Sequence, residues 1–154
     1  MTTQKFRCPH CQTGFQSIVR KDYVIKLPHR DEIIPSAEYF ECENCHERSL
    51  EEKLLVQIDL IEKKEAEKIL ISVHAGKELD TKSVTFLRNV VGMRAVDLSN
   101  KMKISKSTIS NWDKKNTPLP YHLSILLCSL FANKLHLSAI EESFKEDLYL
   151  MIAS

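Results

Sequence analysis

The sequence predicts an α+β fold, with a small β-rich domain followed by helices to the end of the chain. Two Cys-x-x-Cys pairs, with β-branched and aromatic runs between them, indicate the β-rich part. An apolar pattern with helical spacing starts near residue 50 and recurs to the C-terminus. We expect four regions: a cysteine-rich domain at 1–48, a linker helix at 49–76, a helical domain at 77–137 and a C-terminal amphipathic helix at 138–154.

With 154 residues, 43% of them apolar, the chain has room for one ordinary domain or two small ones, and its composition excludes collagen-like and disordered proteins. Its longest apolar stretch, at 123–132, is far shorter than the roughly 20 residues of a membrane span. Three glycines argue against a phosphate-binding glycine loop. Residues 1–7 have no apolar signal core, so we expect a cytoplasmic protein without membrane association, whose five cysteines favour metal over disulfides.

The net charge of +1 conceals an uneven distribution. Residues 81–137 carry nine basic and two acidic side chains, whereas both flanking segments are net acidic. Clustered Lys and Arg displace counterions from phosphates, so this segment predicts a polyanionic partner. A solvated basic face without a partner is the alternative.

Short strands and one long helix are expected before Gly76. Runs such as 17–27 predict a few short strands. Ser49 and Glu52 form the S-x-x-E pattern of a helix cap, and apolar residues recur behind them at helical steps. These residues are Leu54, Ile58, Ile61, Ile69 and Val73. They predict a helix at 50–75 that connects the two domains.

Five helices are expected after Gly76. Three short ones follow from apolar groups without strand alternation: Val84, Leu87, Val90 and Val91; Val96, Leu98 and Met102; Ile104, Ile109 and Trp112. A fourth, at about 120–135, follows the turn at 116–118. Ser138 and Glu141 repeat the capping pattern of a fifth, whose apolar face carries Ile140, Phe144, Leu148 and Ile152.

The two cysteine pairs match the ligand set of a structural zinc site. Zn²⁺ prefers four thiolate or imidazole ligands in a tetrahedron, and two Cys-x-x-Cys turns supply four thiolates. We therefore expect a zinc-binding domain at 1–48 with one Zn²⁺ per chain, bound by Cys8, Cys11, Cys42 and Cys45. Residues 1–47 should unfold without it, because so small a domain has too thin a core.

Other uses of the cysteines remain open at this point. A redox dithiol, an iron site and cysteines without any metal are the alternatives to zinc. His10 and His46 adjoin the pairs, and we expect them beside the metal or at the surface rather than as ligands. Cys128 lies in an apolar helix and is expected in its core.

The stretch 94–113, RAVDLSNKMKISKSTISNWD, predicts two helices joined by a turn at 103–105. Its inward positions are Leu98, Ser99, Met102, Ile104, Ile109 and Trp112. The small Ser99 lets the helices cross closely, Ile104 anchors the turn, and Ser105 caps the second helix. This pattern is typical of a helix-turn-helix whose second helix enters the major groove of DNA.

The outer face of that second helix is polar and basic, which suits double-stranded DNA. The residues expected to bind DNA are Arg94, Lys106, Ser107, Thr108, Ser110, Asn111, Lys114 and Lys115. Ser107 and Asn111, one turn apart, are candidates for reading bases, and the three lysines for contacting phosphates. Thr108 either contacts phosphate or supports the helix, and Arg94 can hold the DNA backbone. An ordinary exposed residue is the alternative at each position.

The segment LSNKMKISKSTISNWDKK resembles the Xre/Cro-type helix-turn-helix. The matching positions are Leu98, Ile104, Ser105, Ile109, Ser110, Trp112 and Asp113. Ala95 stands where a glutamine usually braces a phosphate, and Lys103 where a turn glycine is common. These departures imply a weaker phosphate clamp at Ala95 and a turn conformation at Lys103 that costs about 1 kcal/mol.

The order of CPHC, CENC, a connecting segment and this helix-turn-helix resembles the MqsA/YgiT-type antitoxins of bacterial toxin-antitoxin operons, over about residues 6–135. The resemblance implies zinc bound by the four cysteines, dimerisation through the Xre-type domain at 77–137, and binding of a palindrome in the protein's own promoter. It also implies a toxin held by the N-terminal domain. A longer zinc domain and linker, and an acidic tail after Ser138, depart from the family.

Together these features predict a DNA-binding transcriptional regulator and not an enzyme. We expect a homodimer on a two-fold operator, because one small recognition helix buries little surface. An autoregulating antitoxin is the more specific form of this prediction. The alternatives are a phage or mobile-element repressor without a toxin, a protein-interaction adaptor, and a dithiol oxidoreductase that would need a free cysteine pair.

Overall fold

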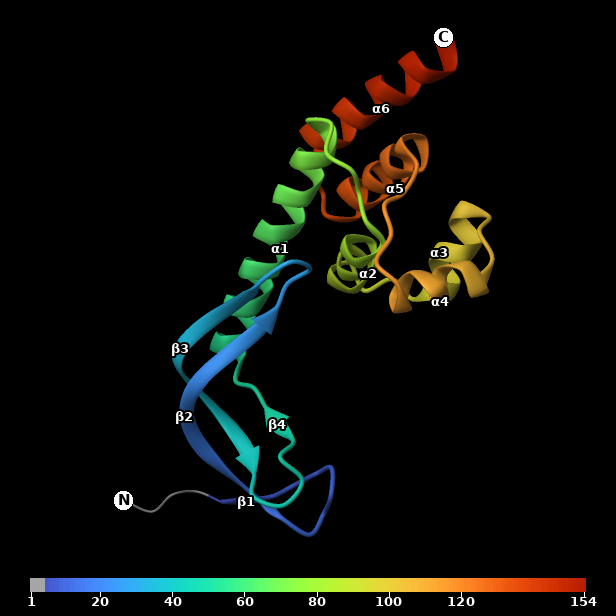
Figure 1. Cartoon of the computed structure of the whole chain (residues 1–154). Coiled ribbons are helices and arrows are strands. Elements are labelled where there is room, and N and C mark those ends of the chain that lie inside the picture. The colour runs from blue at the N-terminus through green and yellow to red at the C-terminus, as the bar shows by residue number, and fades with distance from the viewer. Residues whose placement is uncertain (1–4) are drawn as a thin grey trace. The chain divides into compact units, whose positions relative to one another are not determined.

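The computed structural model describes residues 5–154, and over that range it has the predicted α+β fold, with a four-stranded antiparallel sheet followed by six helices (Figure 1). It divides into two compact units, Met1–Ile61 and Glu62–Ser154, and the division falls inside helix α1 (Glu52–His74). None of the helices in the described range is long and apolar enough to cross a membrane.

One long hairpin dominates the sheet of the first unit. β2 (Phe15–Lys26) and β3 (Asp31–Cys42) have 12 residues each, and the two-residue strands β1 (Phe6–Arg7) and β4 (Arg48–Ser49) lie outside them. The expectation of only short strands is therefore wrong for β2 and β3. These strands continue through polar positions, where ion pairs such as Arg20–Glu38 and Lys21–Glu41 join them in place of apolar contacts.

The core of the first unit is small. Ala37, Tyr39 and Leu54 are its buried members, and the half-buried residues packed around them are Val19, Tyr23, Ile34, Leu50 and Ile58. The guanidinium carbon of Arg48 lies 5.9 Å from the ring centroid of Tyr23 and 5.5 Å from that of Tyr39, so a cation–π contact closes one side. Apolar burial on this scale gives a domain little stability of its own.

Helix α1 nearly matches the helix predicted at 50–75, but its predicted cap is wrong. Ser49 belongs to β4, and its hydroxyl accepts a hydrogen bond from Nε2 of Gln16 (2.9 Å) and lies 3.1 Å from Oε1 of the same side chain. The carbonyl of Glu51 accepts instead from the backbone N–H groups of Leu54 and Leu55, at 3.0 Å each. The serine bonds to a side chain of β2, two strands away in the sheet, which the local S-x-x-E pattern does not reveal.

The second unit is a helical domain with one apolar core. Its helices are α2 (Thr81–Val90), α3 (Ala95–Met102), α4 (Lys106–Lys114), α5 (Tyr121–Lys134) and α6 (Ser138–Ala153), and the end of α1 joins them. Buried members of the core include Leu70, Leu98, Ile109, Phe131 and Phe144. Cys128 is among them, as predicted, and its burial raises the pKa of its thiol to about 12.

Helix α6 packs on this core through part of its predicted stripe. Phe144 is fully buried and Ile140 and Leu148 pack beside it, whereas Ile152 is 85% exposed. The predicted cap at Ser138 and Glu141 is again wrong, because Leu137 is the N-cap and offers no side-chain bond. The Glu141 carboxylate accepts from Nδ2 of Asn133 (3.2 Å) and pairs with Lys145 (2.9 Å), so it links α6 to the end of α5.

Candidate functional site

The four cysteines lie in two turns with the same backbone pattern. Cys8 and Cys11 occupy the connection between β1 and β2, Cys42 is the last residue of β3, and Cys45 lies in the connection between β3 and β4. In each turn the residue after the second cysteine has a left-handed backbone, with φ of 58° at Gln12 and 60° at His46. Its N–H donates to the carbonyl of the first cysteine, at 3.0 Å in one turn and 3.1 Å in the other. Each Cys-x-x-Cys segment is thereby folded so that both of its sulfurs reach the same space.

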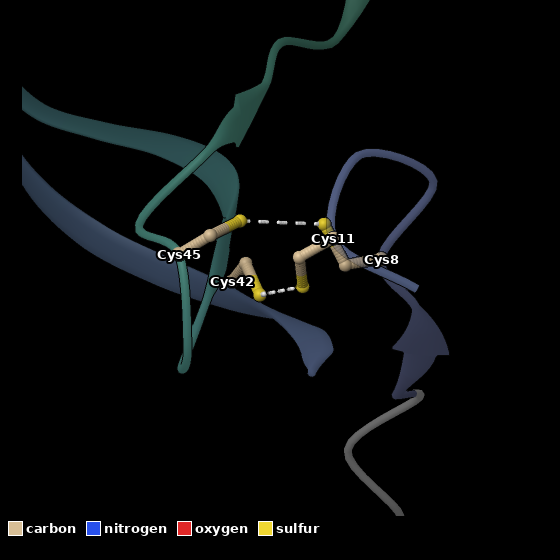
Figure 2. Close-up of side chains that lie close together, drawn as sticks. All are labelled: Cys8, Cys11, Cys42 and Cys45. Atoms are coloured by element: carbon tan, nitrogen blue, oxygen red, sulfur yellow. Dashed lines mark hydrogen bonds between the residues drawn. The ribbon is translucent and has the colours of Figure 1, made fainter. Parts of the chain in front are cut away.

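The sulfur atoms from the two turns meet in one cluster (Figure 2). The Sγ atoms of Cys8 and Cys45 are 3.7 Å apart, as are those of Cys11 and Cys42, and all four lie within 4.8 Å of one another. These spacings are too long for disulfides, whose sulfurs are about 2.0 Å apart. A tetrahedral zinc ion with Zn–S bonds of about 2.3 Å would place its ligands about 3.8 Å apart. The cluster therefore fits a metal ion such as zinc.

Neighbouring backbone groups pack tightly around the four sulfur atoms. A Cβ atom at Gly14 would lie 2.6 Å from Sγ of Cys42 and from Cβ of Asn44, so only glycine fits where the two turns approach. The N–H of Gly14 donates to Sγ of Cys11 (3.3 Å), and that of Asn44 to Sγ of Cys42 (3.4 Å). Such N–H donors stabilise thiolates, which are the form of cysteine that binds metal.

The ionisation of the thiols is uneven. Hydrogen bonds from the Thr13 side chain and then from the backbone of Gly14 and Thr13 lower the pKa of Cys11 to about 5. Cys45 accepts a backbone hydrogen bond from Glu47 that lowers its pKa, but burial and the neighbouring thiols outweigh it and raise the pKa to about 12. Four thiolates at this spacing repel one another, so all four ionise only around a cation.

The histidines next to the cysteine turns stand outside the cluster. His10 and His46 are exposed, and among residues 5–154 the group able to hold a metal consists of the four cysteines. All four positions of a tetrahedral ion would thus be filled by protein thiolates. Such a closed site leaves no position for water or substrate and is typical of structural metal sites.

Helices α3 and α4 and the turn between them adopt the conformations expected from the sequence. Lys103 has the left-handed backbone predicted for it, with φ of 55° and ψ of 35°, and its N–H donates to the carbonyl of Ser99. The Ser99 hydroxyl donates to the carbonyl of Ile104 (2.5 Å), so this small residue also ties the turn down by a hydrogen bond. The Ser105 side chain accepts from the N–H of Thr108 (3.2 Å), which confirms Ser105 as the cap of α4.

The predicted DNA-binding residues of α4 share one exposed surface. Ile109 is buried in the core and Trp112 packs against it, which fixes the inner side of the helix. The exposed residues are Lys106, Ser107, Ser110, Asn111, Lys114 and, just after the helix, Lys115. Thr108 is only partly exposed, and its Oγ1 lies 2.8 Å from Oγ of Ser105, so its side chain supports the start of the helix. The hydroxyl of Ser107 also lies 3.0 Å from Oγ of Ser105, whereas the side chains of Lys106, Ser110, Asn111, Lys114 and Lys115 form no hydrogen bond within the described residues and are free to face a ligand.

Arg94 lies at the start of α3 and is already paired. Its Nε and Nη2 donate to the two carboxylate oxygens of Asp97, at 3.0 and 3.1 Å, and its backbone N–H donates to Oδ2 of the same residue (3.1 Å). Asp97 raises the pKa of Arg94, and Arg94 lowers that of Asp97. The pair closes the first turn of α3, and the Asp97 carboxylate offsets the positive charge that Arg94 could offer to a phosphate.

A further set of residues, not predicted from the sequence, joins the end of α4 to α2. The Asp113 carboxylate accepts from Oγ1 of Thr85 (2.7 Å) and from Nη2 of Arg88 (3.2 and 3.3 Å) on α2, and Nη1 of Arg88 also donates to the carbonyl of Met93 (3.2 Å). This network fixes the end of α4 and neutralises the acidic group of that helix. Asp113 was recognisable in the helix-turn-helix pattern, but no local spacing indicates its partners on α2.

Comparison of the chain with protein-family models, with curated proteins and with solved structures gives no match.

Proposed function

We propose that this protein is a cytoplasmic, sequence-specific transcriptional regulator that binds double-stranded DNA as a homodimer and carries one structural Zn²⁺ per chain. The observation that carries the proposal is the exposed face of α4. It combines hydroxyl, amide and ammonium groups, which suit base edges and phosphates, and its opposite side is anchored by Ile109 and Trp112. The acidic Asp113 is paired with Arg88 and does not add free negative charge there.

In the proposed complex α4 lies in the major groove, with α3 crossing the DNA backbone in the Xre manner. Ser107 and Asn111 read base edges near the centre of the exposed face, with Ser110 beside them, and Lys106, Lys114 and Lys115 contact the phosphates. Ser105 and Thr108 hold the first turn of α4 in shape. Two copies on an inverted repeat double the contact surface, which a recognition helix of nine residues needs for tight binding.

The four cysteines would hold zinc as a fold-stabilising ion. The sulfur spacing of 3.7 Å, the N–H donors to sulfur and the closed donor set all support this role. Bound zinc would supply the charge that four thiolates require and join the two cysteine turns. Neither a redox dithiol nor metal-assisted hydrolysis uses a closed four-thiolate site, so the geometry of the cluster supports a structural role for the metal.

A protein partner for the first unit is the second proposal, and one observation favours it. Val24 and Ile33, which pair across β2 and β3, are 42% and 54% exposed, and strand alternation puts them on the face opposite the small core. Apolar side chains gathered on an exposed sheet face are typical of interaction sites. A toxin bound here would make the protein an MqsA/YgiT-type antitoxin, and another protein ligand would make it an adaptor.

The first test is a titration of the purified full-length protein with its own upstream DNA at two salt concentrations, with a scrambled duplex as control. We expect a preference for an inverted repeat, two chains per duplex, and an affinity that falls with salt by a logarithmic slope of about −0.9 per phosphate contacted. Equal affinity for the scrambled duplex would contradict sequence-specific regulation and leave the adaptor.

The partner proposal is tested separately. The product of the adjacent gene is co-purified with the wild-type chain and with Ile33→Lys, which should lose the complex yet keep zinc and DNA binding. Retention of the complex by Ile33→Lys would exclude this face of the hairpin as its site.

A further inference from the structure

The second unit contains a cleft that the base-reading face of α4 does not use. It lies between the start of α2 and the end of α4, and its volume is about 290 Å³. The residues lining it are Lys82, Thr85, Trp112, Asp113, Lys114, Lys115 and Asn116. Three lysines from two separate elements thus border one recess.

The cleft is held in shape by hydrogen bonds to Thr81, which is fully buried. Its hydroxyl donates to the carbonyl of Lys115 (2.6 Å) and accepts from the N–H of Thr117 (3.0 Å). The backbone N–H of Lys82 donates to Oδ1 of Asn116 (3.3 Å). These bonds fix the backbone of Lys115 beside that of Lys82, so the proximity of the two lysines is built into the fold.

The charge of the cleft is positive and not compensated. Its single carboxylate, that of Asp113, is neutralised by Arg88. Lys82, Lys114 and Lys115 form no ion pair within the described part of the chain, in contrast to Lys21, Lys26 and Lys145, which pair with carboxylates. The recess therefore suits an anion.

Neutral donors complete the lining. Because Oδ1 of Asn116 accepts from the backbone, its Nδ2 group is directed away from that bond and can donate. Trp112 adds an indole N–H that has no hydrogen-bond partner among the described residues. The N–H groups at the start of α2 are already used by Asp80 and Asn116, so the lysines and these two side chains are the available donors.

We propose that this cleft binds a phosphate of the DNA backbone, and that Lys82 is a DNA ligand supplied by α2. This inference rests on the proposed function and extends it, because the sequence places phosphate contacts only on α4, just after it, and at Arg94. Lysine ammonium groups and amide or indole donors are suited to a phosphodiester oxygen, and a fixed site outside the base-reading face positions the helix without selecting sequence.

The test compares Lys82→Gln with the wild type in salt titrations on the operator and on scrambled DNA. We expect Lys82→Gln to weaken both complexes by the same factor and to reduce the logarithmic salt slope by about 0.9, the value for one phosphate contact. Lys82→Arg should restore the slope. Lys134→Gln, an exposed lysine of α5 with the same loss of charge, should keep it.

The outcomes separate the two proposals. A wild-type slope in Lys82→Gln, or an equal decrease in Lys134→Gln, would overturn the role of the cleft while the regulator stands. If the wild type did not prefer its operator to scrambled DNA, the proposed function as a regulator would be wrong. If it bound no DNA at all, both the proposed function and the proposed phosphate site would be wrong. Circular dichroism on each variant shows that a changed slope does not come from unfolding.

Discussion

In the first unit three buried side chains, Ala37, Tyr39 and Leu54, form the described core, whereas the second unit buries sixteen in one cluster. The first unit instead brings four cysteine sulfurs together at the end of its hairpin, where apolar packing is sparse. The second unit needs no such cross-link, because its helices bury their apolar faces against one another. The two units therefore depend on different interactions, and each can be disrupted separately.

The same difference explains how the second unit can present a polar surface. Helix α4 has nine residues and would not be stable alone in water. Ile109 in the core, the Ser105 cap and the Asp113–Arg88 pair hold it from one side and from both ends. Its outer residues are therefore free for a ligand, since none of them is needed for packing.

Loss of the metal gives the largest expected effect. Structural zinc contributes about 10 to 16 kcal/mol of binding free energy in small zinc domains, so Cys42→Ser or a chelator should unfold residues 6–49. Residues 79–144 should stay folded. Native mass spectrometry measures the metal content. Amide hydrogen exchange across the full chain shows which residues unfold and which stay folded.

Cys128→Ala is the matched control, because Cys128 lies in the core of the second unit and outside the sulfur cluster. It should leave the metal content unchanged. If Cys42→Ser also increased amide hydrogen exchange throughout residues 79–144, the two units would not be stabilised independently of one another.

Truncation of the helical core comes next. Phe144→Ala removes a fully buried ring that α6 contributes to the second unit, so it should lower the free energy of unfolding by about 3 to 5 kcal/mol. Tyr149→Ala on the same helix, where the side chain is 80% exposed, should change it by less than about 0.5 kcal/mol. Urea denaturation that monitors unfolding of the second unit distinguishes the two variants. Equal changes in the free energy of unfolding would mean that α6 is not part of this core.

The sequence predicts the features that depend on local spacing. Helical periodicity locates α2 to α6 within a few residues, Ser105 caps α4 as its pattern predicts, and the cysteine spacing predicts the cluster. Features set by contacts distant in sequence are missed. Ser49 bonds Gln16 across the sheet instead of capping α1, and Asp113 pairs with Arg88 on another helix. The cleft beside Lys82 likewise arises only when Thr81 joins the segment after α4.

Substitutions on the outer face of α4 are the third test, and they act on binding rather than on folding. Asn111→Ala should cost about 1 to 3 kcal/mol at one operator position and relax the base preference there. Lys114→Ala should weaken all DNA similarly and decrease the salt slope. Competition binding on operators with single base changes measures both. Equal losses on random DNA for the two variants would contradict the division of roles.

The smallest effect concerns the turn between α3 and α4. Lys103 has a φ of 55°, a conformation in which a side chain is strained and glycine is not. Lys103→Gly should therefore raise the free energy of unfolding by about 1 kcal/mol, whereas Lys101→Gly, inside α3, should lower it by a similar amount, because glycine is a poor helix former. Thermal denaturation without DNA measures both variants. A loss of stability in Lys103→Gly would show that contacts of the lysine side chain outweigh the strain of its backbone.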